Sequence, residues 1–206
     1  MSGMERERSI AAAEHAIGLL LACSRRLRIV EKEARAGGIP FPYPTDRRLQ
    51  RELESKNLLL VGFDEIASHV ARKARGLELT VRAWDDAVPP AEMGAAGVER
   101  VDDLREGLAW CDYVCVLGGS GAIPANAIGR EAFSVMKEGS FVVDLGLCDA
   151  LDRTALRDAV ASGRISGAGL DSIRNVALFE DMDKVLITDR CASLVGVHAG
   201  GGVIDA

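Results

Sequence analysis

Apolar runs of strand length alternate with helix-like segments through most of this chain, and this alternation limits the fold more than any other feature. The segments predicted to be strands are 57–62, 79–84, 112–117, 140–145, 165–169 and 184–188. The segments predicted to be helices between them are 65–75, 102–109, 130–137 and 152–162. Strands that alternate with crossover helices build a parallel sheet covered on both faces. We therefore predict an α/β fold with a doubly wound parallel sheet.

A helical arm precedes this alternation. Residues 10–35 are predicted to form one long helix, which ends at a glycine pair and leads into a proline-stiffened connector at 39–44. We divide the chain into the arm with its connector, residues 1–46, and a sheet domain, residues 47–206. The arm has little core of its own, so its apolar stripe must pack elsewhere. Two arrangements satisfy it: the helix folds back onto the domain, or it embraces a second copy of the chain.

The composition argues against several classes of protein. With 206 residues, 48% of them hydrophobic, the chain can bury a substantial core. The net charge of −6 and the 4% of aromatic residues argue against nucleic acid as the main partner. We expect no membrane span, because no apolar run is long enough, and no signal peptide, because charged residues interrupt the N-terminus. An odd number of cysteines, mostly in apolar runs, predicts a reduced, cytoplasmic location; they are Cys23, Cys111, Cys115, Cys148 and Cys191.

The turn after the first predicted strand has the shape signal of a dinucleotide-binding turn without its glycines. In a G-x-G-x-x-G turn, the second and third glycines let the backbone approach a pyrophosphate and pack the helix on the strand. Gly62 supplies the first glycine, but Asp64 and Ala67 hold the other two places. Two like charges ~4 Å apart repel by roughly 4 kcal/mol at an effective dielectric near 20, about a thousandfold in affinity. Asp64, with Glu65 beside it, is therefore expected to oppose a dinucleotide.

Several segments, taken in order, carry a resemblance to a known family. They are residues 13–21, the Gly62 turn, residues 136–139, the run from Ser162 to Asp171, and residues 184–188. Together they resemble the cofactor domain of the D-isomer-specific 2-hydroxyacid dehydrogenases, and the run 162–171 is the most specific part. The resemblance implies a Rossmann-like fold for the sheet domain. In related enzymes the cofactor domains pair about the arm, so we prefer a homodimer formed through the N-terminal helix.

The resemblance also assigns candidate cofactor-binding residues. Asp85 falls where the family binds the ribose hydroxyls, and Asp171 matches its aspartate near the nicotinamide carboxamide. The glycine-rich loop 118–121 follows a predicted strand across the switch point from the Gly62 turn, where backbone amides could form an anion nest. A plain connector is the simpler interpretation of that loop. The candidate set is Gly62, Asp85, Gly118, Gly119 and Asp171.

The family's catalytic residues are replaced in this chain. Its substrate-clamping arginine corresponds to Leu147, its supporting glutamate to Val176 and its acid/base histidine to Arg190. Loss of a general acid/base typically reduces a rate about a hundred- to ten-thousandfold. We therefore predict no catalytic residue. We also predict no metal site, because Cys148 and Cys191 lack the close spacing of a metal-binding pair.

Two functional interpretations follow. The preferred one is a catalytically degenerate relative, a pseudoenzyme that serves as a scaffold, regulatory or accessory subunit for a protein partner. We expect the chain to lack the family's substrate domain of roughly a hundred residues, and we expect no cofactor. The alternative is an NAD(H)-binding oxidoreductase, or an enzyme subunit, with altered chemistry in a remodelled cleft.

Overall fold

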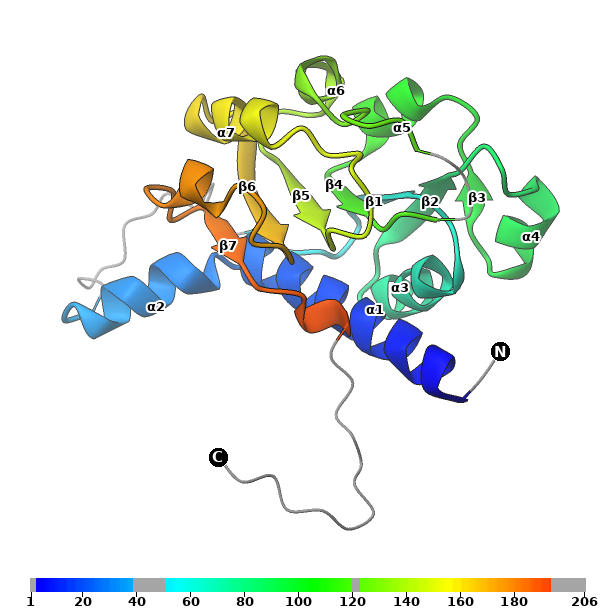
Figure 1. Cartoon of the computed structure of the whole chain (residues 1–206), viewed down its shortest axis with the longest axis horizontal. Coiled ribbons are helices and arrows are strands. Elements are labelled where there is room, and N and C mark those ends of the chain that lie inside the picture. Colours follow the sequence, from blue (N-terminus) through cyan, green and yellow to red (C-terminus); the bar gives the residue numbers. More distant parts are fainter. Residues whose placement is uncertain (1–2, 39–50, 120–122, 194–206) are drawn as a thin grey trace, which may run out of the picture.

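A sheet of seven parallel strands forms the centre of the computed structural model, which describes residues 3–38, 51–119 and 123–193 (Figure 1). The strand order is β3-β2-β1-β4-β5-β6-β7, so the chain reverses direction across the sheet between β1 and β4. This is the order of a doubly wound dinucleotide-binding fold, and the predicted fold class is confirmed. The strands are β1 Asn57–Val61, β2 Thr80–Trp84, β3 Glu99–Arg100, β4 Tyr113–Val116, β5 Ser140–Asp144, β6 Ile165–Leu170 and β7 Val185–Ile187.

The helices fall close to their predicted positions, with additions that the sequence pattern did not reveal. The short helix α4 and the two-residue strand β3 lie in a stretch for which the pattern predicts no element. None of the helices in the described ranges is long and apolar enough to cross a membrane. The helices are α1 Gly3–Ser24, α2 Leu27–Arg35, α3 Glu65–Gly76, α4 Pro90–Ala95, α5 Leu104–Trp110, α6 Arg130–Val135 and α7 Arg153–Ala161, with 3-10 turns η2 Val176–Phe179 and η3 Cys191–Ser193.

The core consists of two apolar layers, one on each face of the sheet. Alternate residues of β1 point to opposite faces: Leu58 and Leu60 join one layer, and Leu59 and Val61 join the other. Helices α1 and α3 cover the first face, and α5, α6 and α7 cover the second (Figure 1). A strand buried on both faces is apolar throughout, which is why the sequence shows continuous apolar runs.

The prediction of a single helix over 10–35 is wrong. Arg26 adopts a left-handed backbone conformation with φ of 52°, and the chain breaks there into α1 and α2. The break lets α1 pack along the sheet of its own chain, while α2 continues past the edge strand β7 (Figure 1). Close packing of α1 depends on Gly169 in β6, because a Cβ atom there would lie 2.9 Å from the Leu19 Cβ. The proposed division at residue 46 lies outside the described residues.

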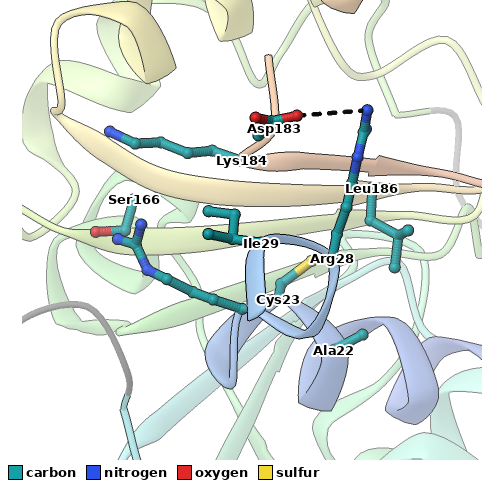
Figure 2. Close-up of a pocket in the computed structure, with 9 residues that line it drawn as sticks. Ala22, Cys23, Arg28, Ile29, Ser166, Asp183, Lys184 and Leu186 are labelled. Carbon is teal, nitrogen blue, oxygen red and sulfur yellow. Dashed lines mark ion pairs between the residues drawn. The ribbon is translucent and has the colours of Figure 1, made fainter. Parts of the chain in front are cut away.

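Helix α2 contacts the domain mainly through charged side chains. Arg28 and Lys32 pair with Asp183 at 3.8 Å and 2.5 Å, and α2 has no buried residue. Below the helix break lies a pocket of about 20 Å³ (Figure 2), which has room for about one water molecule. It is therefore a packing gap rather than a ligand site. Its lining comprises Ala22, Cys23, Arg26, Arg28, Ile29, Ser166, Asp183, Lys184 and Leu186.

Candidate functional site

The turn between β1 and α3 keeps the backbone shape of a dinucleotide-binding turn. Gly62 has φ of +92°, a conformation that favours glycine. Its amide donates to the carbonyl of Trp84 at 2.8 Å, which ties the turn to the end of β2. The prediction that Gly62 forms a tight strand-to-helix turn is thus confirmed. The chemistry of the turn depends on the residues that follow.

Asp64 caps the N-terminus of α3 with its own side chain. The amide of Ala67 donates to Asp64 Oδ1 at 3.0 Å. Burial raises the pKa of the Asp64 carboxyl, and the hydrogen bonds from backbone amides oppose that rise only in part. A helix N-terminus binds anions through its free amides and its dipole. Here a carboxylate of the chain already occupies that position.

Asp85 is also engaged with the backbone. It follows β2, is only 1% exposed, and accepts hydrogen bonds from the Phe63 amide at 2.9 Å and the Ala87 amide at 3.0 Å. The first of these bonds joins it to the residue next to Gly62. The carboxylate therefore holds the turn in place, in addition to standing where the resemblance expects a ribose.

The loop after β4 lies directly against the Gly62 turn. A Cβ atom at Gly62 would lie 1.3 Å from the carbonyl oxygen of Gly118, and one at Gly119 would lie 2.5 Å from Asp85 Oδ2. The structure therefore brings Gly62, Asp85, Gly118 and Gly119 together at the switch point, as predicted. Because their backbones touch, a ligand would have to lie over the two loops rather than between them. Positions 120 and 121 of the predicted anion nest lie outside the described residues.

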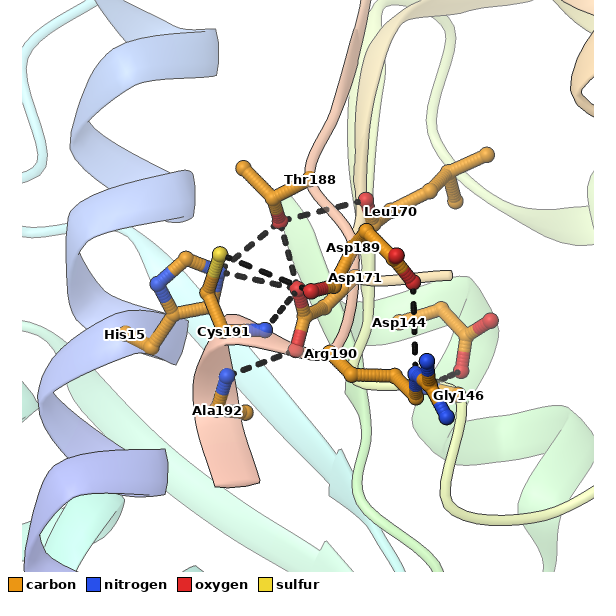
Figure 3. A network of polar contacts seen from close by, with 10 residues as sticks. All are labelled: His15, Asp144, Gly146, Leu170, Asp171, Thr188, Asp189, Arg190, Cys191 and Ala192. Carbon is orange, nitrogen blue, oxygen red and sulfur yellow. Dashed lines mark hydrogen bonds and ion pairs between the residues drawn. The ribbon is translucent and has the colours of Figure 1, made fainter. Parts of the chain in front are cut away.

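Asp171 belongs to a different network, shown in Figure 3. It follows β6, and its Oδ1 accepts hydrogen bonds from Thr188 Oγ1 at 2.6 Å and the Cys191 amide at 2.8 Å, while Oδ2 accepts one from the Ala192 amide at 2.7 Å. His15 on α1 places Nε2 3.4 Å from Asp171 Oδ1 and 2.9 Å from Thr188 Oγ1. This buried carboxylate fixes the segment after β7 against α1.

Comparison with known proteins identifies the family. Residues 17–192 match the family described as D-isomer specific 2-hydroxyacid dehydrogenase, NAD binding domain. The chain belongs to this family. D-3-phosphoglycerate dehydrogenase of Mycobacterium leprae is 33% identical over 78% of this chain, and chloroplastic D-3-phosphoglycerate dehydrogenase 3 of Arabidopsis thaliana is 30% identical over 79%.

The match covers only part of the length of these D-2-hydroxyacid dehydrogenase relatives. The chain spans 30% of the Mycobacterium leprae protein and 27% of the Arabidopsis protein. The holo form of Rhodotorula graminis D-mandelate dehydrogenase superposes with a TM-score of 0.78 and 28% identity, over 91% of this chain and 57% of that chain. The shared part is thus the NAD-binding domain.

The three positions that the resemblance assigns to the family's catalytic residues all follow the carboxyl ends of sheet strands. Leu147 follows β5 and is 48% exposed, and Val176 begins η2 after β6 and is 39% exposed. Arg190 follows β7, and its Nε lies 3.4 Å from Asp189 Oδ1. These positions therefore present two apolar side chains and one guanidinium group where the resemblance expects an arginine, a glutamate and a histidine.

A polar pocket of about 410 Å³ lies beside the carboxyl end of β5, and the sequence pattern did not predict it. Asp144 Oδ2 lies 3.0 Å from Arg153 Nη2, and Asp144 Oδ1 accepts the Gly146 amide at 2.9 Å. Burial raises the pKa of Asp144. Asp144 thus caps a loop amide and pairs with Arg153. The lining comprises Ala125, Asn126, Asp144, Cys148, Asp149, Leu151, Asp152, Arg153, Thr154, Arg174 and Asn175.

The arginines of this pocket are paired with aspartates. Arg174 pairs with Asp149, as Arg153 does with Asp144. Arg153 still carries one buried nitrogen, Nη1, that has no hydrogen-bond partner among the described residues. Cys148 lies on the wall of the pocket, and burial raises the pKa of that thiol. Cys191 lies instead in the Asp171 network, so the two cysteines belong to different clusters.

Proposed function

We propose that this member of the D-2-hydroxyacid dehydrogenase family is catalytically degenerate and acts as an accessory or regulatory subunit, a scaffold for a protein partner. The observation that carries the proposal is the hydrogen bond from the Ala67 amide to Asp64 at the N-terminus of α3. The family's turn receives a pyrophosphate at this helix end. A phosphate group there would meet a carboxylate instead of free amides, and like charges repel.

Asp85 supports the same proposal. Its two carboxylate oxygens accept the Phe63 and Ala87 amides and are almost fully buried. A ribose hydroxyl would have to compete with these intramolecular donors for the carboxylate. Breaking hydrogen bonds to a buried charged group typically costs about 1.5–3 kcal/mol each. Both the pyrophosphate position and the ribose position are therefore engaged by the chain itself.

The side chains at the catalytic positions give further support. Leu147 and Val176 cannot bind a carboxylate or orient a base, and a guanidinium group such as that of Arg190 is not a general acid/base. Without a group that exchanges protons near neutral pH, hydride transfer to or from a 2-hydroxy acid lacks its acid/base partner. We expect no dehydrogenase activity from this chain alone.

Isothermal titration of the purified chain with NADH and NADPH, at low and moderate salt, tests the proposal. We expect no heat of binding up to about millimolar ligand, the weak end of the affinity scale. A matched titration uses the double substitution Asp64→Gly and Ala67→Gly, which restores the glycine pattern. Binding by the double variant alone would support the proposal, and micromolar binding by the wild type would refute it.

An NAD(H)-dependent oxidoreductase, or a subunit of one, is the alternative. Two observations favour it: Gly62 keeps the left-handed conformation of a working turn, and Asp85 lies beside it. A dinucleotide could then lie over the two loops, with altered chemistry at the edge that carries Arg190. A measurable decrease of NADH absorbance with a panel of 2-oxo acids would distinguish this alternative from the scaffold proposal.

We also propose a homodimer formed through the N-terminal helices, in the cytoplasm. The exposed Met4 and Leu27, at 69% and 53%, lie on α1 and α2 and support a contact there. All five cysteines are free thiols, which is consistent with a reducing compartment. Sedimentation equilibrium of the wild type and of Leu27→Glu tests the pairing, because a charge in the contact would shift the protein towards monomer.

A further inference from the structure

We propose that His15, Asp171 and Cys191 form a binding site for Zn²⁺. The three residues come from α1, from the end of β6 and from η3 after β7, and the fold brings them together (Figure 3). Their ligand atoms, an imidazole nitrogen, a carboxylate oxygen and a thiol sulfur, all lie within 4.8 Å of one another. This site is separate from the Gly62 turn, and it does not depend on the function proposed above.

The spacing of the donors suits a tetrahedral metal ion. Zinc binds nitrogen and oxygen at about 2.0–2.2 Å and sulfur at about 2.3 Å, so neighbouring donors in a tetrahedron lie roughly 3.3–3.6 Å apart. His15 Nε2 and Asp171 Oδ1 are 3.4 Å apart. That separation is longer than an ordinary hydrogen bond, and it matches one edge of the tetrahedron. The Cys191 Sγ lies within 4.8 Å of both atoms, and the other edges form as the thiol closes on the ion.

The carboxylate is already held in position for this task. The Cys191 and Ala192 amides donate to the two oxygens of Asp171, at 2.8 Å and 2.7 Å. Hydrogen bonds of this kind orient metal-binding side chains, and their loss typically reduces metal affinity about 10- to 100-fold. One residue, Cys191, thus supplies both an orienting amide and the sulfur ligand.

The Thr188 hydroxyl bridges two of the proposed ligands, Asp171 and His15. It donates to Asp171 Oδ1 at 2.6 Å, so its oxygen can accept the Nε2 proton of His15 at 2.9 Å. On metal binding, the Thr188 hydroxyl gives up its hydrogen bonds to Asp171 Oδ1 and His15 Nε2. The neutral imidazole then carries its proton on Nδ1, and Nε2 turns its lone pair to the ion. The Cys191 thiol releases its proton to solvent and binds as thiolate. The thiolate and the carboxylate together balance the two positive charges of the ion.

The donor set also selects the type of ion. A thiolate and an imidazole favour zinc and similar transition metals over Mg²⁺ and Ca²⁺, which prefer oxygen ligands. Three ligands are present among the described residues, which leaves a fourth position for water or another ligand, as in open zinc sites. The side chain of His15 is 22% exposed and Cys191 is partly exposed, so an ion can reach the site from solvent.

Titration of the tag-free chain with Co²⁺, followed by absorption spectroscopy, tests the site. Cobalt reports a tetrahedral site through its visible bands and a thiolate ligand through a charge-transfer band. We expect one Co²⁺ per chain, with both signals, and their loss when Zn²⁺ is added. Cys191→Ser is expected to remove the charge-transfer band, and His15→Gln to weaken binding by at least about tenfold.

Cys148→Ser is the matched control, because this cysteine lies in the other cluster, and it should leave the spectrum unchanged. Circular dichroism of each variant checks that the fold is retained. Asp171 is left intact, since its carboxylate also anchors η3. The proposal fails if the wild type shows no saturable Co²⁺ binding, or if Cys148→Ser removes the charge-transfer band while Cys191→Ser keeps it.

Discussion

The Asp85 carboxylate and the Phe63 amide lie 2.9 Å apart, and this bond fastens the end of β2 to the turn that follows β1. In a similar way, the Asp64 carboxylate accepts a hydrogen bond from the Ala67 amide and caps the start of α3. Two acidic side chains thus hold backbone amides in the region where the family binds an anionic cofactor. Side chains of the domain itself therefore stabilise the turn, and under the proposed function the same groups oppose a dinucleotide.

Replacement of Asp85 should affect stability strongly. Asp85→Ala is expected to lower the free energy of unfolding by about 2–4 kcal/mol, because two backbone amides lose a charged, buried acceptor. Urea denaturation followed by circular dichroism measures this. Asp86→Ala is the control: Asp86 is exposed, and its loss should change stability by no more than about 0.5 kcal/mol. Equal effects of the two substitutions would mean that Asp85 does not hold the turn.

Asp64→Asn separates charge from capping. Asparagine caps a helix about as well as aspartate, so this variant keeps the fold of the turn and removes its negative charge. If repulsion is the main obstacle, the variant should bind NADH up to about a thousandfold more tightly than the wild type. Isothermal titration compares the two. Unchanged affinity would shift the explanation from charge to the backbone contact between the two loops.

The stability of the same variant should depend on pH in a defined direction. Because burial raises the pKa of Asp64 above its ordinary value of 3.8, the folded state favours the protonated carboxyl. Its stabilising contribution is present below the ordinary pKa and is lost as pH rises through the folded pKa. Asp64→Asn should therefore gain stability relative to the wild type as pH rises from below 3.8 to above the folded pKa. Denaturant midpoints across that range measure the difference, and a relative loss would give the wrong sign.

Two glycines should respond oppositely to alanine. Gly169→Ala places a methyl group 2.9 Å from the Leu19 Cβ, and such overpacking typically costs about 1–3 kcal/mol. Gly18 is exposed within α1, and a Cβ atom added there would meet no neighbouring atom within 4 Å, so Gly18→Ala should stabilise by about 0.5–1 kcal/mol. Thermal unfolding of both variants is the measurement. A neutral Gly169→Ala would mean that α1 shifts away from β6 at little cost.

The sequence predicted the sheet well because its strands are buried on both faces. The runs 57–61 and 140–144 are largely apolar and can therefore be recognised as strands. The turn at Gly62 can be recognised because glycine readily adopts the positive φ that the turn needs. The sequence also placed the loop after β4 across the switch point from the Gly62 turn, since strand ends in a doubly wound sheet meet at one edge. Asp171, which belonged to the same candidate set, lies in a different network.

Other features depend on contacts between distant residues. At the break, Arg26 adopts a left-handed backbone conformation, which helical periodicity does not encode. His15 and Asp171 are far apart in the chain, and only the folded structure places them 3.4 Å apart. The hydrogen bonds between Asp85 and backbone amides were likewise not predictable. An aspartate at this place in the sequence suits both a ribose-binding role and a bond to the chain's own backbone.

The position of α1 has a consequence for how the chain folds during synthesis. The apolar face of α1 packs on β5 and β6 and on η3, which leave the ribosome long after the helix itself. At about 5–20 residues per second, roughly 7–30 s separate the emergence of α1 from that of β6. During this interval Leu19 lacks Gly169 of β6, the residue against which it packs in the folded domain, and its apolar side chain stays exposed on that side.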